Sequence, residues 1–238
     1  MHRSSVLLLV IVATFSFPFA AFAQEPDECS LKFTGSDRKL VKNRPANTAS
    51  NQGYKGFNNG NPITVTEWYD LVCEMDGQLP HDLRNISQTK PLPDVGTIEV
   101  TVSGFILATQ FERYTGSPGP DNDFHMEVSE STKWNSPHFI VEVPAGKQYC
   151  DARKVVAGAI RAETGKQHVA AKYKFKKPIK VEVTGLVFFD AHHAPGCLKK
   201  ELDYCQCDGG RGSRISGKSK VQGLWEIHPV TAIKVISE

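Results

Sequence analysis

TIEVTVSGFI, residues 97–106, is the stretch of sequence that decides the fold. Ile98, Val100 and Val102 alternate with polar residues, so an extended chain here has one apolar side and one polar side. A period of two is typical of a half-buried β-strand. Gly104 interrupts the alternation and predicts a bend or a bulge. The stretch therefore predicts a protein built mainly from β-strands, of which this is the first.

Four later segments repeat the apolar alternation of this strand. They are residues 124–128, 139–143, 179–189 and 225–235, the last of which is interrupted by Pro229. Residues 151–163 instead place apolar side chains at helical spacing, which predicts an amphipathic helix. The predicted order is three strands, a helix and two more strands.

This order of elements resembles the OB-fold, a small five-stranded Greek-key barrel. The resemblance covers residues 95–236 and implies a mainly β, OB-fold-like five-stranded barrel. Staphylococcal-nuclease-like domains share the order, but the chain carries none of their catalytic motif, so no activity follows. The strings DFHMEVSE, FIVEVP, VEVTGLVFFD and WEIHPVTAI also resemble a family of uncharacterised bacterial exported proteins that end in an EIHPV-type strand. That likeness implies a compartment and a fold, and it supplies no function.

Residues 1–23 have the pattern of a cleavable signal peptide. Arg3 precedes an apolar run, and Ala21-Phe22-Ala23 is a typical cleavage site, so we expect the cut before Gln24. The apolar run is too short to anchor the chain in a bilayer, and we expect no membrane span elsewhere. The sequence thus predicts a secreted or periplasmic protein. Cleavage lowers the formal net charge from +2 to +1, which predicts no global attraction to nucleic acid or membranes.

Residues 24–94 are predicted to form an N-terminal extension ahead of the OB-like domain at 95–238. Within it, residues 34–61 are rich in Gly, Asn and Ser and predict a poorly ordered lead-in. Residues 63–73 predict a short helix with Thr64 or Thr66 as its cap. Three prolines, at 80, 91 and 93, then mark a linker.

All six cysteines lie after the signal peptide, and an even number in an exported chain favours disulfides. They are Cys29, Cys73, Cys150, Cys197, Cys205 and Cys207. Sequence alone cannot choose among the many pairings. We favour Cys29 with Cys73, because both precede the main β-region, which leaves the other four to pair among themselves. A zinc site is the competing interpretation, but no C-x-x-C spacing supports it.

Three acid–histidine pairs have i, i+2 spacing, which places both side chains on one face of a strand. They are His125 with Glu127, Asp190 with His192, and Glu226 with His228. Each pair is out of phase with the apolar face of its strand. Carboxylate and imidazole are ligands for zinc and other divalent ions and the usual acid–base groups. The alternative, which we favour, is an ordinary polar outer sheet face with surface or structural hydrogen bonds, in which cross-strand Glu–His or Asp–His contacts are common. His81, His138 and His168 have no evident partner and are expected to be solvated.

The segment 166–180 holds six lysines and no acid, with Tyr173 and Phe175 among them. Lysines beside aromatic rings are what single-stranded nucleic acid binding uses. The candidate anion-binding residues are Lys172, Lys174, Lys176 and Lys177. The alternative, which we again favour, is a solvated loop whose lysines discourage pairing between sheet edges.

Two functions remain open from the sequence. The first is an exported binding module without catalysis, whose ligand is an anionic polymer or a protein partner. The second is a metal-dependent hydrolase of phosphodiesters, with a divalent metal as its cofactor. In that case Asp190, His192, Glu226 and His228 are the expected ligands or acid–base groups. A metal assay on the purified protein separates the two.

Overall fold

The computed structural model describes most of the predicted domain together with parts of the extension. The described residues are Cys29, 61–77, 98–111, 123–165, 173–190, Cys197, Asp203, 205–207 and 220–237, with backbone only at Lys220 and Val221. The expected signal peptide, the lead-in up to residue 60 and the three linker prolines lie outside this set.

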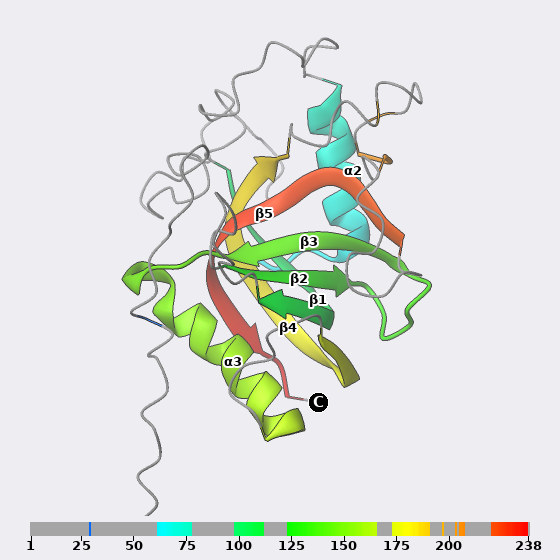
Figure 1. The fold of residues 1–238 in the computed structure, drawn as a ribbon. Coiled ribbons are helices and arrows are strands. Elements are labelled where there is room, and N and C mark those ends of the chain that lie inside the picture. The colour runs from blue at the N-terminus through cyan, green and yellow to red at the C-terminus, as the bar shows by residue number, and fades with distance from the viewer. Residues whose placement is uncertain are drawn as a thin grey trace, which may run out of the picture.

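Five strands form a closed barrel in the order β1-β2-β3-β5-β4 (Figure 1). They are β1 (Glu99–Phe111), β2 (Phe124–Ser129), β3 (Pro137–Val143), β4 (Tyr173–Phe189) and β5 (Lys220–Val235). All neighbouring strands run antiparallel except β3 and β5, which are parallel. Helix α3 (Cys150–Thr164) follows a short 3-10 turn, Lys147–Tyr149, and lies between β3 and β4 in the chain. This confirms the predicted OB-fold-like barrel of three strands, a helix and two strands.

The barrel core contains the apolar residues whose alternation along the sequence predicted the strands. Ile98, Val100 and Val102 are buried inside, and Val102 pairs across the sheet with Val183 of β4. The predicted irregularity lies further along β1 than Gly104, because the register shifts between Ile106 and Ala108. Gly104 has a different role. A Cβ there would lie 2.8 Å from Val128 and 2.9 Å from the Ser129 carbonyl oxygen, so glycine permits close packing of β1 against β2.

Strand β5 continues through Pro229, although the sequence predicted an interruption there. The expected irregularity appears instead in its pairing with β4, where the register shifts on both sides of Gly185. A Cβ on Gly185 would lie 2.6 Å from Ile227 and 2.9 Å from Val230. The absence of a side chain at Gly185 thus lets the two strands approach at the irregular point.

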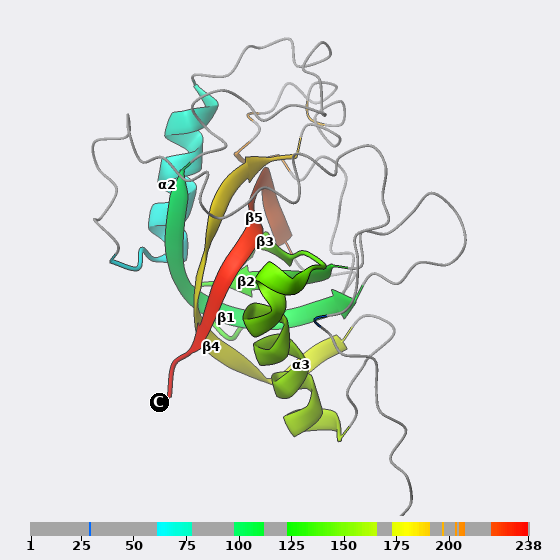
Figure 2. The same ribbon diagram turned by 90° about the vertical axis from the view of Figure 1, so that its left-hand side faces the viewer.

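Helix α2 (Val65–Asp76) confirms the predicted short helix, with Thr64 as its cap. The Thr64 hydroxyl accepts the Glu67 N–H, and the Glu67 carboxylate accepts the Thr64 N–H at 2.7 Å, which is a capping box. Trp68 is fully buried, with its ring centroid 4.9 Å from that of Phe139. Helices α2 and α3 lie toward opposite ends of the barrel (Figure 2).

The capping box gives the first testable prediction, which concerns Glu67→Gln. Hydrogen bonds from the backbone N–H and the hydroxyl of Thr64 hold the pKa of Glu67 below its usual value. A lowered folded-state pKa adds stability above the unfolded-state pKa, and this stability is lost as the pH falls through the folded value. We therefore expect Glu67→Gln to lower the melting temperature slightly at pH 7 and to match wild type near pH 3. Thermal unfolding at both pH values is the test, and an equal deficit at both would contradict it.

All six cysteines form disulfides, as predicted, but the preferred pairing of Cys29 with Cys73 is wrong. The bonds are Cys29–Cys150, Cys73–Cys205 and Cys197–Cys207. The reason is that the end of α2 packs against chain that is distant in sequence. There, Asp76 accepts hydrogen bonds from the Cys205 N–H and the Trp225 indole N–H, at 3.3 and 3.1 Å.

Within the described part of the chain, no helix has the length and apolar character needed to cross a bilayer.

Candidate metal centre

Strands β2, β3 and β5 present a polar row on the face opposite the barrel core. Along β2, Phe124, Met126 and Val128 belong to the core cluster, so His125 and Glu127 point the other way. His125 pairs in register with Glu142 of β3. Val141 of β3 pairs with Ile227 of β5, which brings the next residues, Glu142 and His228, side by side. The barrel thus aligns His125, Glu142 and His228 across three strands.

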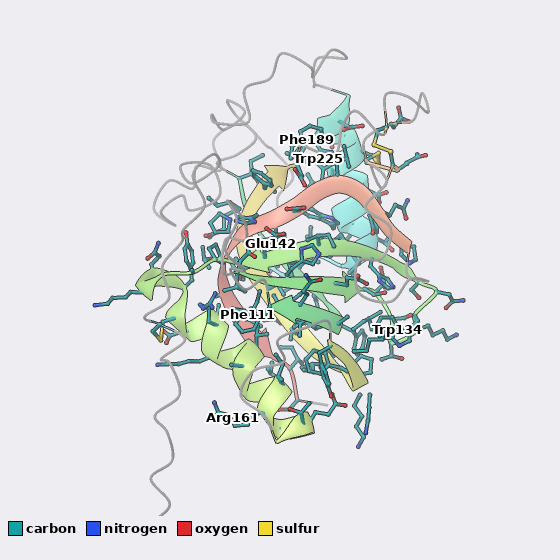
Figure 3. All side chains as sticks on the ribbon, in the orientation of Figure 1. Phe111, Trp134, Glu142, Arg161, Phe189 and Trp225 are labelled. Atoms are coloured by element: carbon teal, nitrogen blue, oxygen red, sulfur yellow. A yellow bond between two sulfur atoms is a disulfide. The ribbon has the colours of Figure 1, made fainter. Side chains whose placement is uncertain are left out.

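This polar row is buried rather than on the surface, and it contains the cross-strand acid–histidine contacts that structural hydrogen bonding predicts. The exposed fractions of His125, Glu142 and His228 are 3%, 5% and 0%. Figure 3 shows Glu142 where β3 runs beside β5. A buried carboxylate needs hydrogen bonds or opposite charge to offset its lost hydration. The row is therefore stable only as a connected polar group.

Glu142 is the centre of that group. Its Oε1 lies 2.8 Å from Nδ1 of His125, and its Oε2 lies 2.5 Å from Nδ1 of His228. An ionised Glu142 therefore accepts a hydrogen bond from Nδ1 of His125, which makes Nε2 of that ring an acceptor. Nε2 of His125 is buried and has no hydrogen-bond partner among the described residues. The Phe188 ring packs against His228 with a centroid separation of 5.5 Å.

Asp123 completes the site from the residue just before β2. It is fully buried, and ligand atoms of Asp123, Glu142 and His228 all lie within 4.8 Å of one another. Two carboxylates and one imidazole match the donor set of zinc and similar divalent ions. Ligand atoms on one tetrahedral zinc stand roughly 3.3 Å apart for bonds of about 2.0 Å. The short contact between Glu142 and His228 would thus have to open when an ion enters.

A second acid–histidine contact lies one step along the same face. Nδ1 of His138 lies 3.0 Å from Oε2 of Glu127, and both side chains are fully buried. His138 was expected to be solvated, and this is wrong. The reason is diagonal pairing, since His138 lies opposite Ser129 while Glu127 lies opposite Ile140. The predicted pair of His125 with Glu127 is consequently split, because each residue takes its partner from β3.

The remaining predicted residues lie outside the three-ligand group. Asp190 follows β4, is buried, and donates its N–H to the Leu224 carbonyl. Glu226 is buried on β5, in register with Ile140 and Phe188. His192 lies outside the described residues, so its predicted role with Asp190 stays a prediction.

Sequence reasoning found His125 and His228 and missed Asp123 and Glu142. The sequence did contain a pattern that pointed to Glu142. This acid interrupts the apolar string FIVEVP on the face opposite the core residues, as His125 does on its own strand. An acid in that phase on β3 could have been counted with the three pairs. Asp123 offered a weaker signal, since it ends a turn-rich stretch where acids are common.

The candidate anion-binding lysines lie away from this site, on β4. Lys174, Lys176 and Lys177 are exposed, whereas Lys172 lies outside the described residues. Residues from Tyr173 onward belong to the strand, so the expected solvated loop is wrong for this part.

Comparison of the sequence with protein-family models and with curated proteins gives no match. The function is therefore argued from the geometry of the site.

Proposed function

We propose that the protein is an exported OB-like binding module that holds a divalent metal ion at Asp123, Glu142 and His228. The observation that carries the proposal is the convergence of three ligand-type side chains, from three separate parts of the chain, within 4.8 Å. Acidic groups on a surface often gather without binding an ion, but these three side chains are buried. Two carboxylates held close together away from water repel each other, and a dication between them relieves that repulsion.

His125 supports the same proposal from outside the three-ligand group. Its Nδ1 contacts the Glu142 oxygen that faces away from His228. A hydrogen bond to a ligating carboxylate fixes its orientation and typically raises metal affinity by about 10–100-fold. His125 is therefore assigned a positioning role.

Export is supported by the cysteines. All three disulfides, Cys29–Cys150, Cys73–Cys205 and Cys197–Cys207, imply folding in an oxidising compartment. The signal-peptide pattern of residues 1–23 agrees with this. Carboxylates and imidazoles are the remaining ligands for a metal ion in this chain, because all six cysteine thiols form disulfides.

One observation favours a second candidate, a metal-dependent hydrolase of phosphodiesters. Three protein ligands leave a tetrahedral ion one open position, which is the pattern of catalytic zinc sites. Burial argues for the first candidate, because a polymeric substrate has to reach the ion and these ligands are at most 5% exposed. Hydrolysis of bis(4-nitrophenyl) phosphate by the zinc-loaded protein, abolished in Asp123→Asn, would establish the hydrolase. No zinc-dependent hydrolysis supports the binding module.

The test of the metal centre is zinc binding by the full mature chain. We expect one zinc ion per chain after loading and dialysis, measured by elemental analysis and by calorimetry. Asp123→Asn and His228→Gln should lose the stoichiometric ion, because each removes one of three ligands. His125→Gln should retain the site with an affinity about 10–100-fold lower.

The matched control is Glu182→Gln, which removes a half-buried carboxylate on β4 that is bonded to Lys234. It should bind zinc as wild type does. The proposal is wrong if wild type retains no ion, or if Asp123→Asn and Glu182→Gln bind zinc equally well.

A further inference from the structure

The first half of β4 carries a second, independent feature. Residues 173–180 contain four lysines and no acid. All four are exposed and are called here the lysine strip: Lys174, Lys176, Lys177 and Lys180. The strip lies on a different part of the barrel from the metal centre, and nothing below rests on the metal proposal.

Protection of an open strand edge is the ordinary explanation for such lysines, and the structure weakens it. Strand β5 pairs with β4 only from Val181 onward, so the strip segment pairs with β1 alone. Lys176 and Lys177 lie where the β1–β4 register shifts, between the Ile106–Ile179 and Ala108–Lys174 pairs, and their backbone is already bonded. The Glu163 carboxylate, from the end of α3, accepts the N–H groups of Lys176 and Lys177 at 2.7 and 3.2 Å. Pairing with another chain is thus blocked there without any need for charge.

Glu163 contacts the backbone of Lys176 and Lys177 rather than their ammonium groups. Its Oε1 accepts those two N–H groups, and its Oε2 accepts the Tyr173 hydroxyl at 2.7 Å. Desolvation and this hydrogen bond raise the pKa of Tyr173 to about 12, so the hydroxyl remains a donor at neutral pH. Among the described residues, no carboxylate forms an ion pair with the ammonium groups of Lys176, Lys177 or Lys180.

An aromatic ring lies at one end of the strip. The Lys174 ammonium lies 5.0 Å from the ring centroid of Trp134, a half-buried residue between β2 and β3. Figure 3 shows Trp134 near the start of β4. Lys133, next to it, is exposed and adds a further positive charge.

We propose that the lysine strip and Trp134 form a binding surface for single-stranded nucleic acid. The exposed ammonium groups would contact phosphates along the strand direction, and a base would stack against the Trp134 ring beside Lys174. Every base has a flat π-face and every nucleotide a charge, which is the combination that this surface complements. A sulfated polysaccharide would also satisfy the lysines, and competition with heparin separates it from nucleic acid.

The experiment measures fluorescence anisotropy of a labelled 20-nucleotide oligo-dT with the mature protein across a salt series. Three phosphate contacts predict that log affinity falls with log salt with a slope of about −2. The triple variant K176Q/K177Q/K180Q should flatten this slope almost completely. Trp134→Ala should weaken binding about tenfold at fixed salt, with the slope unchanged.

A second triple variant, K147Q/K154Q/K234Q, removes the same charge from exposed lysines elsewhere and should behave as wild type. Unlabelled heparin serves as the competing polyanion. The proposal is overturned if both triple variants lose affinity equally, if Trp134→Ala has no effect, or if heparin binds and oligo-dT does not.

Discussion

Replacing His138 with alanine is expected to lower the free energy of unfolding by about 3–5 kcal/mol. Glu127 and His138 are both fully buried, and the imidazole Nδ1 lies 3.0 Å from the carboxylate. Loss of the ring leaves a buried carboxylate without that contact and creates a cavity beside it. Urea denaturation of the mature protein at pH 7 measures the loss.

The control for this prediction replaces the whole pair. Glu127→Leu with His138→Leu removes both polar groups, and apolar replacement of a buried pair is often close to neutral. The double variant should therefore be more stable than His138→Ala alone, although it has lost more polar atoms. If the double variant is the less stable of the two, Glu127 depends on contacts other than His138 and the pair is not the unit of stability.

The fold could be predicted from the sequence because its signals are local. Residues 97–106 and the four later segments alternate in the chain, and residues 151–163 follow a helical period, so each element forms where its own pattern indicates. The exception is the start of β4. Lysines at 174, 176 and 177 led to the prediction of a loop, whereas the strand begins at Tyr173. There, pairing with β1 outweighs the polar character of the side chains.

The candidate site could be predicted only in part because its contacts are not local. Parity along β2 and β5 correctly placed His125 and His228 on the face away from the core. Residues two apart on a strand point the same way but lie roughly 6–7 Å apart, too far for a direct hydrogen bond between short side chains. The true partner, Glu142, comes from β3 through the register of the barrel. The burial of this polar face also could not be predicted, because alternation shows that a strand has two faces and does not show whether the polar one is covered by other chain.

The predicted pairing of Cys29 with Cys73 was wrong for the same physical reason. Cys73 pairs with Cys205 across 132 residues, because α2 packs beside the segment that precedes β5. Closeness in sequence favoured Cys29, whereas packing brings Cys150 to Cys29 instead. Pairing follows the tertiary contacts of the helices, which no spacing of cysteines encodes.

Replacing Ile227 with alanine is expected to lower the free energy of unfolding by about 2–5 kcal/mol and to leave zinc binding intact. Ile227 is fully buried in the core, in register with Val141 of β3 and Val187 of β4. The cavity left by the missing atoms has no route to collapse between two paired strands. His228, the next residue, points to the opposite face and contacts Glu142.

Thermal unfolding with and without zinc separates the roles of these two neighbours. A ligand that binds only the folded state adds about 2.7 kcal/mol at one hundred times its dissociation constant. Ile227→Ala should melt below wild type and still gain the full zinc increment, because Asp123, Glu142 and His228 remain. His228→Gln, which keeps a polar side chain beside Glu142, should lose the increment whatever its own melting temperature. If His228→Gln gains as much from zinc as Ile227→Ala does, the ion binds elsewhere and His228 is a structural partner of Glu142 alone.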